Sequence, residues 1–128
     1  MQLKPLLFIF FGGGVGASLR YLLSTWINAK TADSTSTAVT FPWGIFACNL
    51  VGCFLIGTVY GWLKSQHPDW VHPLFVTGLL GGFTTFSSFA LDSQILLQNQ
   101  AYLAAGLYAI GSLIFGITLC FVGYLITS

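Results

Sequence analysis

Four long apolar stretches account for almost all of this 128-residue chain. They cover residues 5–27, 41–63, 73–97 and 101–126, and each is long enough to cross a bilayer, which takes about 20 mostly apolar residues. Inside a bilayer the backbone N–H and C=O groups must bond within their own segment, so we expect each stretch to be a helix. The sequence therefore predicts an all-α membrane protein in which residues 1–128 form a single four-helix transmembrane domain.

The charge content excludes several other classes of protein. Only 5% of the residues are charged, whereas a soluble domain carries about 25%. The net charge of +1 provides no basic face for nucleic acid, so no nucleic-acid partner is expected. The sequence shows no paired carboxylates, no Ser-His-Asp spacing, no His/Cys ligand cluster and no phosphate loop, which argues against an enzyme. Cys48, Cys53 and Cys120 lie inside the stretches and are expected to be small buried residues rather than disulfide partners or metal ligands.

The few positive charges are divided evenly between the two sides of the membrane. Four spans place both termini on one side, together with Lys4 and Lys64, while the other side has Lys30 and, if its side chain extends to the interface, Arg20. Lys and Arg in short loops normally set the orientation, so this balance favours insertion in both directions. Two oppositely oriented copies would form an antiparallel homodimer with a two-fold axis in the membrane plane. The alternative is that one loop charge or a partner decides the orientation.

The third stretch has an unusual centre, where Gly81 and Gly82 precede a run rich in Thr and Ser. Adjacent glycines weaken a helix, and a break near the bilayer midplane would expose backbone groups that an ion could satisfy. The alternative is close helix packing through Gly78 and Gly82, which are four residues apart. The residues alone do not decide between these interpretations.

Three polar side chains inside the stretches need an explanation, and two of them have more than one interpretation. Arg20 either extends to the membrane interface as an anchor, or attracts an anion or braces the helix packing. Asn49 either links helices by a hydrogen bond or donates its amide to an anion in a pore. Asp92 is the only acid within a span, and we expect its carboxylate to reach the interface.

Aromatic rings and hydroxyls cluster beyond the two glycines. Phe86 and Phe89 are three residues apart, which places them on one helix face, and Tyr108 and Ser112 share a face of the fourth stretch. The edge of an aromatic ring is positive, so ring edges with hydroxyl and amide donors can replace water around a small anion. This set would suit an ion the size of chloride or fluoride. The alternative is that the phenylalanines face lipid or fill the core.

Four segments of the sequence together carry a resemblance to a known family: 12–21 (GGGVGASLRY), 49–52 (NLVG), 78–89 (GLLGGFTTFSSF) and 111–113 (GSL). In this order, over all four spans, they resemble the CrcB/Fluc family of fluoride channels. The resemblance implies an antiparallel, dual-topology homodimer whose third helix is broken near its centre. It also implies two narrow pores that export fluoride passively across the bacterial inner membrane and so provide fluoride resistance.

The same resemblance implies a role for particular residues. The backbone carbonyls of Gly81 and Thr84, from both subunits, would hold a structural sodium ion at the dimer axis, and Arg20 would match the arginine of the family's first span. The fluoride pore would be lined by neutral groups, namely Asn49, Phe86, Ser87, Ser88, Phe89, Tyr108 and Ser112.

Two positions depart from the family pattern. Asp92 stands where the family often has glutamate, which puts a vestibule role for the carboxylate in question, and Gly116 stands where a third hydroxyl often follows Ser112. There are two alternative functions. A small dual-topology multidrug exporter needs an acid in its binding chamber, yet the first two spans contain none. A non-transporting membrane assembly subunit would explain the glycines but not the clustered Asn, Thr, Ser and Tyr side chains.

Overall fold

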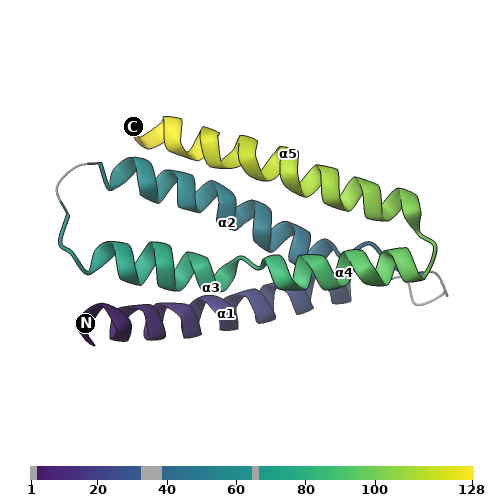
Figure 1. Ribbon diagram of the computed structural model, residues 1–128, viewed down its shortest axis with the longest axis horizontal. Helices are drawn as coiled ribbons and strands as arrows, with labels where there is room; N and C mark the ends of the chain where they lie inside the picture. Colours follow the sequence, from purple (N-terminus) through teal and green to yellow (C-terminus); the bar gives the residue numbers. More distant parts are fainter. Residues whose placement is uncertain (1–2, 33–38, 65–66) are drawn as a thin grey trace.

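The computed structural model describes residues 3–32, 39–64 and 67–128, so parts of the two expected loops, residues 33–38 and 65–66, lie outside the described residues. Within these ranges four helical segments are long and apolar enough to cross a membrane. This confirms the expected all-helical, four-span architecture. In chain order (Figure 1), the elements are α1 (Leu3–Thr31), α2 (Trp43–Trp62), the π-helical η1 (His72–Leu80), α3 (Gly81–Phe83), α4 (Phe86–Gln98) and α5 (Tyr102–Thr127).

The first helix is longer than its apolar stretch. The first apolar stretch ends at residue 27, but α1 continues to Thr31. The Thr31 hydroxyl donates to the Ile27 carbonyl at 3.0 Å, and Lys30 in the last turn complements the partial negative charge of the helix end. The side-chain oxygen of Asn28 also accepts a hydrogen bond from the backbone N–H of Gly44, at 2.9 Å. These contacts stabilise the last turn of α1, which lies beyond the apolar stretch.

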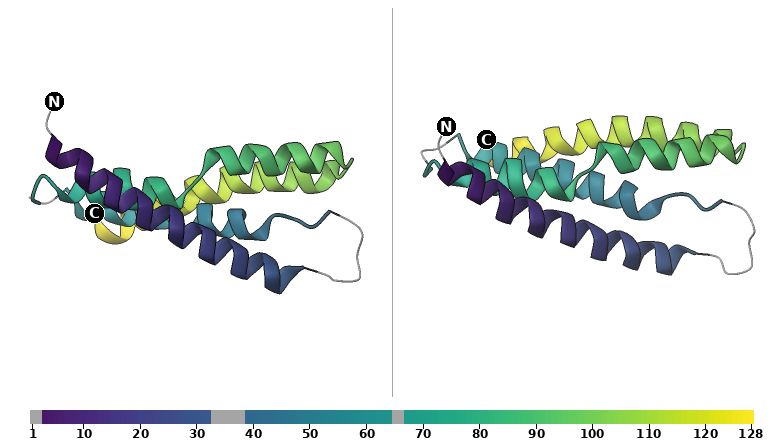
Figure 2. Two further views of the ribbon diagram at one scale, coloured as in Figure 1. Left: turned by 90° about the horizontal axis from the view of Figure 1, so that it is seen from below. Right: turned by 60° about the horizontal axis from the view of Figure 1, so that its bottom comes forward.

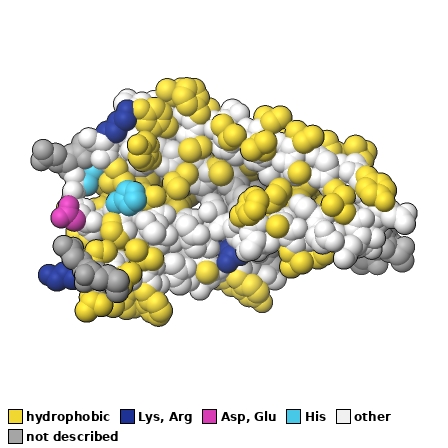
Figure 3. Space-filling model, viewed as in Figure 1, with side chains coloured by type: hydrophobic (Ala, Val, Ile, Leu, Met, Phe, Trp, Pro, Cys, Tyr) yellow, Lys and Arg dark blue, Asp and Glu magenta, His cyan; other side chains and the backbone are white. Residues whose placement is uncertain are grey.

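The surface matches the low charge of the sequence. Both chain termini lie at the same end of the molecule (Figure 1). Apolar side chains cover much of the face shown in Figure 3, and Lys and Arg atoms appear there only near that end and at one point near the middle. Phe10 is 74% exposed and Leu103 is 78% exposed. Large apolar side chains exposed in this number are compatible with lipid as the surrounding solvent.

Glycines bring the helices close together. Gly78 would place a Cβ 3.0 Å from the Cα of Gly12, and Gly82 would place one 2.5 Å from the carbonyl oxygen of Gly13. The close packing through Gly78 and Gly82 that the sequence suggested is therefore present between the third span and α1. Cβ atoms at Gly12, Gly16, Gly57 and Gly123 would overlap the facing carbonyl oxygens of Leu74, Leu79, Cys120 and Phe54, respectively.

The third span changes its partner midway. Its first half, η1 and α3, packs against α1, whereas its second half, α4, packs against α5 (Figure 2). Between them Thr84 (φ −84°, ψ 155°) and Thr85 (φ −152°, ψ 124°) have extended backbones. Gly81 and Gly82, where the sequence suggested weakness, are themselves helical because Gly82 is held against α1. The extended residues follow them, at the point where the chain leaves α1 for α5.

Candidate functional site

The extended segment is secured by the side chain of Asn49 on α2. The backbone N–H of Thr85 donates to Asn49 Oδ1 at 2.8 Å, and Asn49 Nδ2 donates to the carbonyl oxygen of Thr85 at 3.1 Å. One side-chain amide thus pairs with both the N–H and the C=O of Thr85. Because a side-chain amide has two N–H donors, one donor of Asn49 remains for another acceptor.

The same threonine starts the next helix. Thr85 is the N-cap of α4, and its Oγ1 accepts a hydrogen bond from the backbone N–H of Ser88 at 3.2 Å. The hydroxyls of Ser87 and Ser88 lie 3.1 and 3.2 Å from the same oxygen. Threonine and serine favour this position because their oxygens satisfy the free N–H groups of a first turn. The Thr/Ser run seen in the sequence is therefore a capping structure around the extended residues.

Arg20 links the two parts of the third span. Its Nε donates to the carbonyl oxygen of Gly82 in α3 at 3.3 Å, and its Nη1 donates to Ser88 Oγ in α4 at 3.3 Å. The rigid fork of a guanidinium suits such a two-point contact. Of the interpretations left open by the sequence, this geometry favours a brace for the helix packing.

A cavity of about 370 Å³ lies beside the extended residues, between α2, the start of α4 and α5. Its apolar wall includes the rings of Phe86 and Phe89. Its polar wall consists of Asn49, Cys53, Thr84, Thr85 and Ser112. None of these residues carries a formal charge at neutral pH, so the cavity can bind an ion only through dipoles, ring edges and hydrogen-bond donors.

One polar atom of this cavity wall is unsatisfied. Ser112 Oγ is buried and has no hydrogen-bond partner among residues 3–32, 39–64 and 67–128. Such atoms are rare in folded proteins because the lost hydration costs free energy. A buried hydroxyl without a partner is suited to donate to a ligand that enters the cavity.

The phenylalanine rings continue into a row that ends inside the protein. The ring centroids of Phe86 and Phe89 are 5.5 Å apart, and those of Phe89 and Tyr108 are 5.0 Å apart. Phe86 is 80% exposed, whereas Tyr108 is 0% exposed and packs edge-on against Phe41. The Tyr108 hydroxyl donates to Asp92 Oδ2 at 3.2 Å. Asp92 thus has a hydrogen-bond partner inside the helix bundle.

The structure brings together only part of the residue set expected from the sequence. Asn49, Phe86, Phe89, Ser112 and Thr84 share the cavity wall. In the described part of the chain, the other expected residues take no part in that wall: Arg20, Gly81, Ser87, Ser88, Asp92 and Tyr108.

Two polar residues of the wall, Cys53 and Thr85, were missing from the expected site. Thr85 belongs to the quoted Gly/Thr/Ser segment, but only the structure shows that its peptide group binds Asn49. Cys53 follows Asn49 by four residues, a spacing that places both on one face of α2. This four-residue spacing is the sequence feature that could have indicated Cys53 as part of the site.

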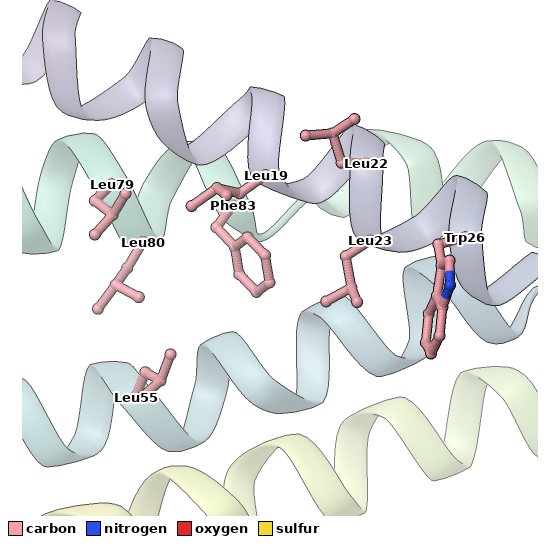
Figure 4. A pocket seen from close by; sticks show the side chains of 8 residues that line it. All are labelled: Leu19, Leu22, Leu23, Trp26, Leu55, Leu79, Leu80 and Phe83. Atoms are coloured by element: carbon pink, nitrogen blue, oxygen red, sulfur yellow. The ribbon is translucent and has the colours of Figure 1, made fainter.

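Another cavity has a different chemistry. It has a volume of about 510 Å³ and lies between α1, α2 and the first half of the third span. The residues around it are all apolar apart from the indole of Trp26, and include Leu23, Leu55 and Phe83 (Figure 4). It offers little to an ion. As for metals, no group of three His, Cys, Asp or Glu side chains in the described ranges is arranged to hold one.

Comparison with known proteins identifies the family. The family described as "CrcB-like protein, Camphor Resistance (CrcB)" matches residues 7–124. The chain belongs to the CrcB family. A relative from Novosphingobium aromaticivorans, named fluoride-specific ion channel FluC, is 43% identical over 117 residues, which cover 91% of this chain and 90% of the relative.

Two further relatives carry the same name. The FluC protein of Phocaeicola vulgatus is 45% identical over 116 residues, covering 90% of this chain and 91% of its own length. That of Oceanobacillus iheyensis is 35% identical over 124 residues, covering 94% and 89%. Family membership and the four apolar spans together make this CrcB-family chain a multi-pass membrane protein.

Proposed function

We propose that this chain is a fluoride-selective ion channel that lets fluoride leave the bacterial cytoplasm passively across the inner membrane. Its membership of the CrcB family and the names of its relatives support this function. The structural observation that carries the proposal is the unsatisfied Ser112 hydroxyl in a neutral cavity that also contains Asn49 and two phenylalanine rings.

The cavity suits a small anion that accepts strong hydrogen bonds. An ion enters a narrow pore only if protein groups replace its hydration shell. The Ser112 hydroxyl and the remaining N–H of Asn49 can donate hydrogen bonds, and the ring edges of Phe86 and Phe89 offer positive potential. Since no cation takes part in this donor set, the ion is bound weakly enough to leave again, which conduction requires.

Asn49 has a double role in this proposal. Its hydrogen bonds to the Thr85 peptide orient the amide, and the second N–H is directed by that orientation. A fixed donor loses less conformational entropy when the ion arrives than a freely rotating one. Both functions considered from the sequence, helix linker and anion donor, then belong to the same side chain.

The assembly in this proposal is an antiparallel homodimer with two pores. Near the span ends, Lys4 and Lys64 lie on one side and Lys30 on the other, so the bias amounts to a single charge, which supports insertion in both orientations. Phe86 supports a partner as well, because this residue is 80% exposed at the wall of the cavity. A second copy would close the open side of that cavity.

We also propose a structural sodium ion at the dimer axis, near the break in the third helix. Gly81 begins the short helix α3 that precedes the change to extended backbone, and Thr84 is the first extended residue. Their carbonyl oxygens, doubled by the two-fold axis, are ligands of the kind that hard cations prefer. Each chain would supply only main-chain carbonyl oxygens as ligands. The sodium ion would place a positive charge where the two chains meet.

The test is fluoride efflux from liposomes that contain the purified protein, measured beside chloride efflux. We expect rapid fluoride efflux and little chloride efflux, and equal rates for the two anions would refute selectivity. Phe86→Ile and Asn49→Ala should reduce fluoride flux sharply. Phe10→Ile is the matched control, because Phe10 is 74% exposed on α1 and should leave the flux unchanged.

The sodium proposal has a separate test. Replacing sodium on both sides with a bulky organic cation should weaken fluoride flux or dimer assembly. Unchanged flux and an unchanged dimer, measured by cross-linking in the same liposomes, would refute the sodium site and leave the channel function standing.

A further inference from the structure

Gly116 leaves a gap in the polar surface of α5. Ser112 lies one helical turn earlier and carries the unsatisfied hydroxyl, whereas Gly116 has no side chain to follow it. The space beside Gly116 is occupied by the side chain of Cys53, which belongs to α2. A Cβ atom added to Gly116 would lie 3.4 Å from Cys53 Sγ, which is ordinary van der Waals contact.

Cys53 also stands where two cavities meet. The first is the cavity of about 370 Å³ that contains Asn49 and the phenylalanine rings. The second has a volume of about 890 Å³ and runs along α2 and α5 past Gly116 to Tyr124. Among the described residues, the polar side chains that line both cavities are those of Cys53 and Ser112. An ion that leaves the first cavity along α5 therefore passes these two groups.

We propose that the Cys53 thiol is a donor of the conduction path, which supplies from α2 the polar group that α5 lacks at Gly116. This inference rests on the proposed channel function. A thiol is a weak donor, and its sulfur is polarisable and adaptable in shape. It can follow Ser112 as the next contact for fluoride without binding the ion tightly.

The other two cysteines provide an internal comparison. In the described part of the chain all three cysteines are free thiols. Cys48 is 0% exposed, and its Sγ lies 3.8 Å from the carbonyl oxygen of Arg20. Cys120 lines the larger cavity and is absent from the wall of the smaller one, as far as the described residues show. Cys53 is therefore the thiol whose modification should obstruct passage between the cavities.

The experiment uses methyl methanethiosulfonate, a small neutral thiol reagent. The thiolate attacks the sulfenyl sulfur, a protein S–S–CH₃ disulfide forms, methanesulfinate leaves, and the thiol proton passes to solvent. Two full-length variants are reconstituted in liposomes. One retains only Cys53 and carries Cys48→Ala and Cys120→Ala, while the matched variant carries Cys53→Ser and retains the other two cysteines. Intact-protein mass spectrometry reports which thiols have reacted.

The reagent should block fluoride efflux in the variant that retains only Cys53, and a dithiol reductant should restore it. The Cys53→Ser variant should conduct before and after treatment. Without reagent, Cys53→Ala should reduce flux about threefold, as expected for loss of a weak hydrogen bond, and Cys53→Ser should restore it.

Three results would overturn this inference while unmodified protein still conducts fluoride. They are no reaction at Cys53, full reaction at Cys53 without loss of flux, or equal block of the Cys53→Ser variant. If the unmodified protein itself conducts no fluoride, the proposed function fails first, and the inference fails with it. Fluoride efflux of the unmodified chain thus separates the two failures.

Discussion

The contact between Gly52 on α2 and Thr84 is the tightest point beside the extended segment. A Cβ atom at Gly52 would overlap Thr84 Cγ2, and its next neighbour would be Phe83 Cδ1 at 3.3 Å. The Thr84 side chain cannot simply rotate away, because its hydroxyl donates to the Leu80 carbonyl at 2.9 Å. We therefore predict that Gly52→Ala forces Thr84 away from α2 and disturbs the hydrogen bonds between Thr85 and Asn49.

The cost can be estimated from two opposing effects. Insertion of a methyl group into a packed site costs about 1–3 kcal/mol, while alanine gains about 1 kcal/mol over glycine as a helix former. The net loss of stability should be about 0–2 kcal/mol. Because the overlap involves only Cγ2, Thr84→Ser should relieve it while keeping the hydroxyl. The double variant should then be about 1–2 kcal/mol more stable than the sum of the two single effects predicts.

The assay is unfolding in mixed micelles by increasing sodium dodecyl sulfate, followed by the fluorescence of the four tryptophans. Gly106→Ala on α5 is the matched control, because its Cβ would meet no atom of the described chain within 4 Å. That variant should be as stable as the parent or slightly more stable. The argument is refuted if Gly52→Ala behaves like Gly106→Ala, or if the effects of Gly52→Ala and Thr84→Ser simply add.

Two further predictions concern the Ser112 hydroxyl in the cavity and the Arg20 side chain that links the two parts of the third span. Ser112→Ala should raise the free energy of unfolding by about 1 kcal/mol because an unsatisfied buried hydroxyl disappears, and it should lower fluoride flux. Lower stability together with unchanged flux would contradict the role given to this hydroxyl. Arg20→Lys should lose about 1–2 kcal/mol, since one ammonium does not reproduce the paired contacts to Gly82 and Ser88. Lys30→Arg is the control for the charge substitution, and an equal effect of both variants in the detergent titration would refute the brace.

Several alternatives left open by the sequence depend on contacts between distant segments. Asn49 and Thr85 are 36 residues apart, and Arg20 and Gly82 are 62 apart. Neither contact can be deduced from spacing along one helix, because each depends on how two helices are placed against each other. The structure gives Asn49 a linking role that leaves a donor free, and it places the Arg20 guanidinium across the extended segment.

The ring and hydroxyl pattern shows a similar limit. Helical periodicity correctly indicates that Phe86 and Phe89 are neighbours, since their ring centroids are 5.5 Å apart. The same reasoning treats Tyr108 and Ser112 as equivalent members of one track. In the structure the Tyr108 hydroxyl is directed to Asp92, and Ser112 lines the cavity. Periodicity defines a face of one helix, but the neighbouring helices decide what each part of that face meets.

The sequence by itself determined that the chain lies in a lipid bilayer, that its spans are helices and that its site consists of neutral groups. These are local properties: each apolar stretch must satisfy its own backbone in lipid, and a chain with 5% charged residues can build an ion site only from neutral groups. Only the tertiary structure decided which neutral groups share a cavity. Gly12 and Gly52 set how closely α1 and α2 approach the third span, and this approach positions Asn49 against Thr85 and Cys53 beside Gly116. Such contacts depend on how helices that are far apart in sequence are positioned against one another. No single stretch of the sequence encodes that position.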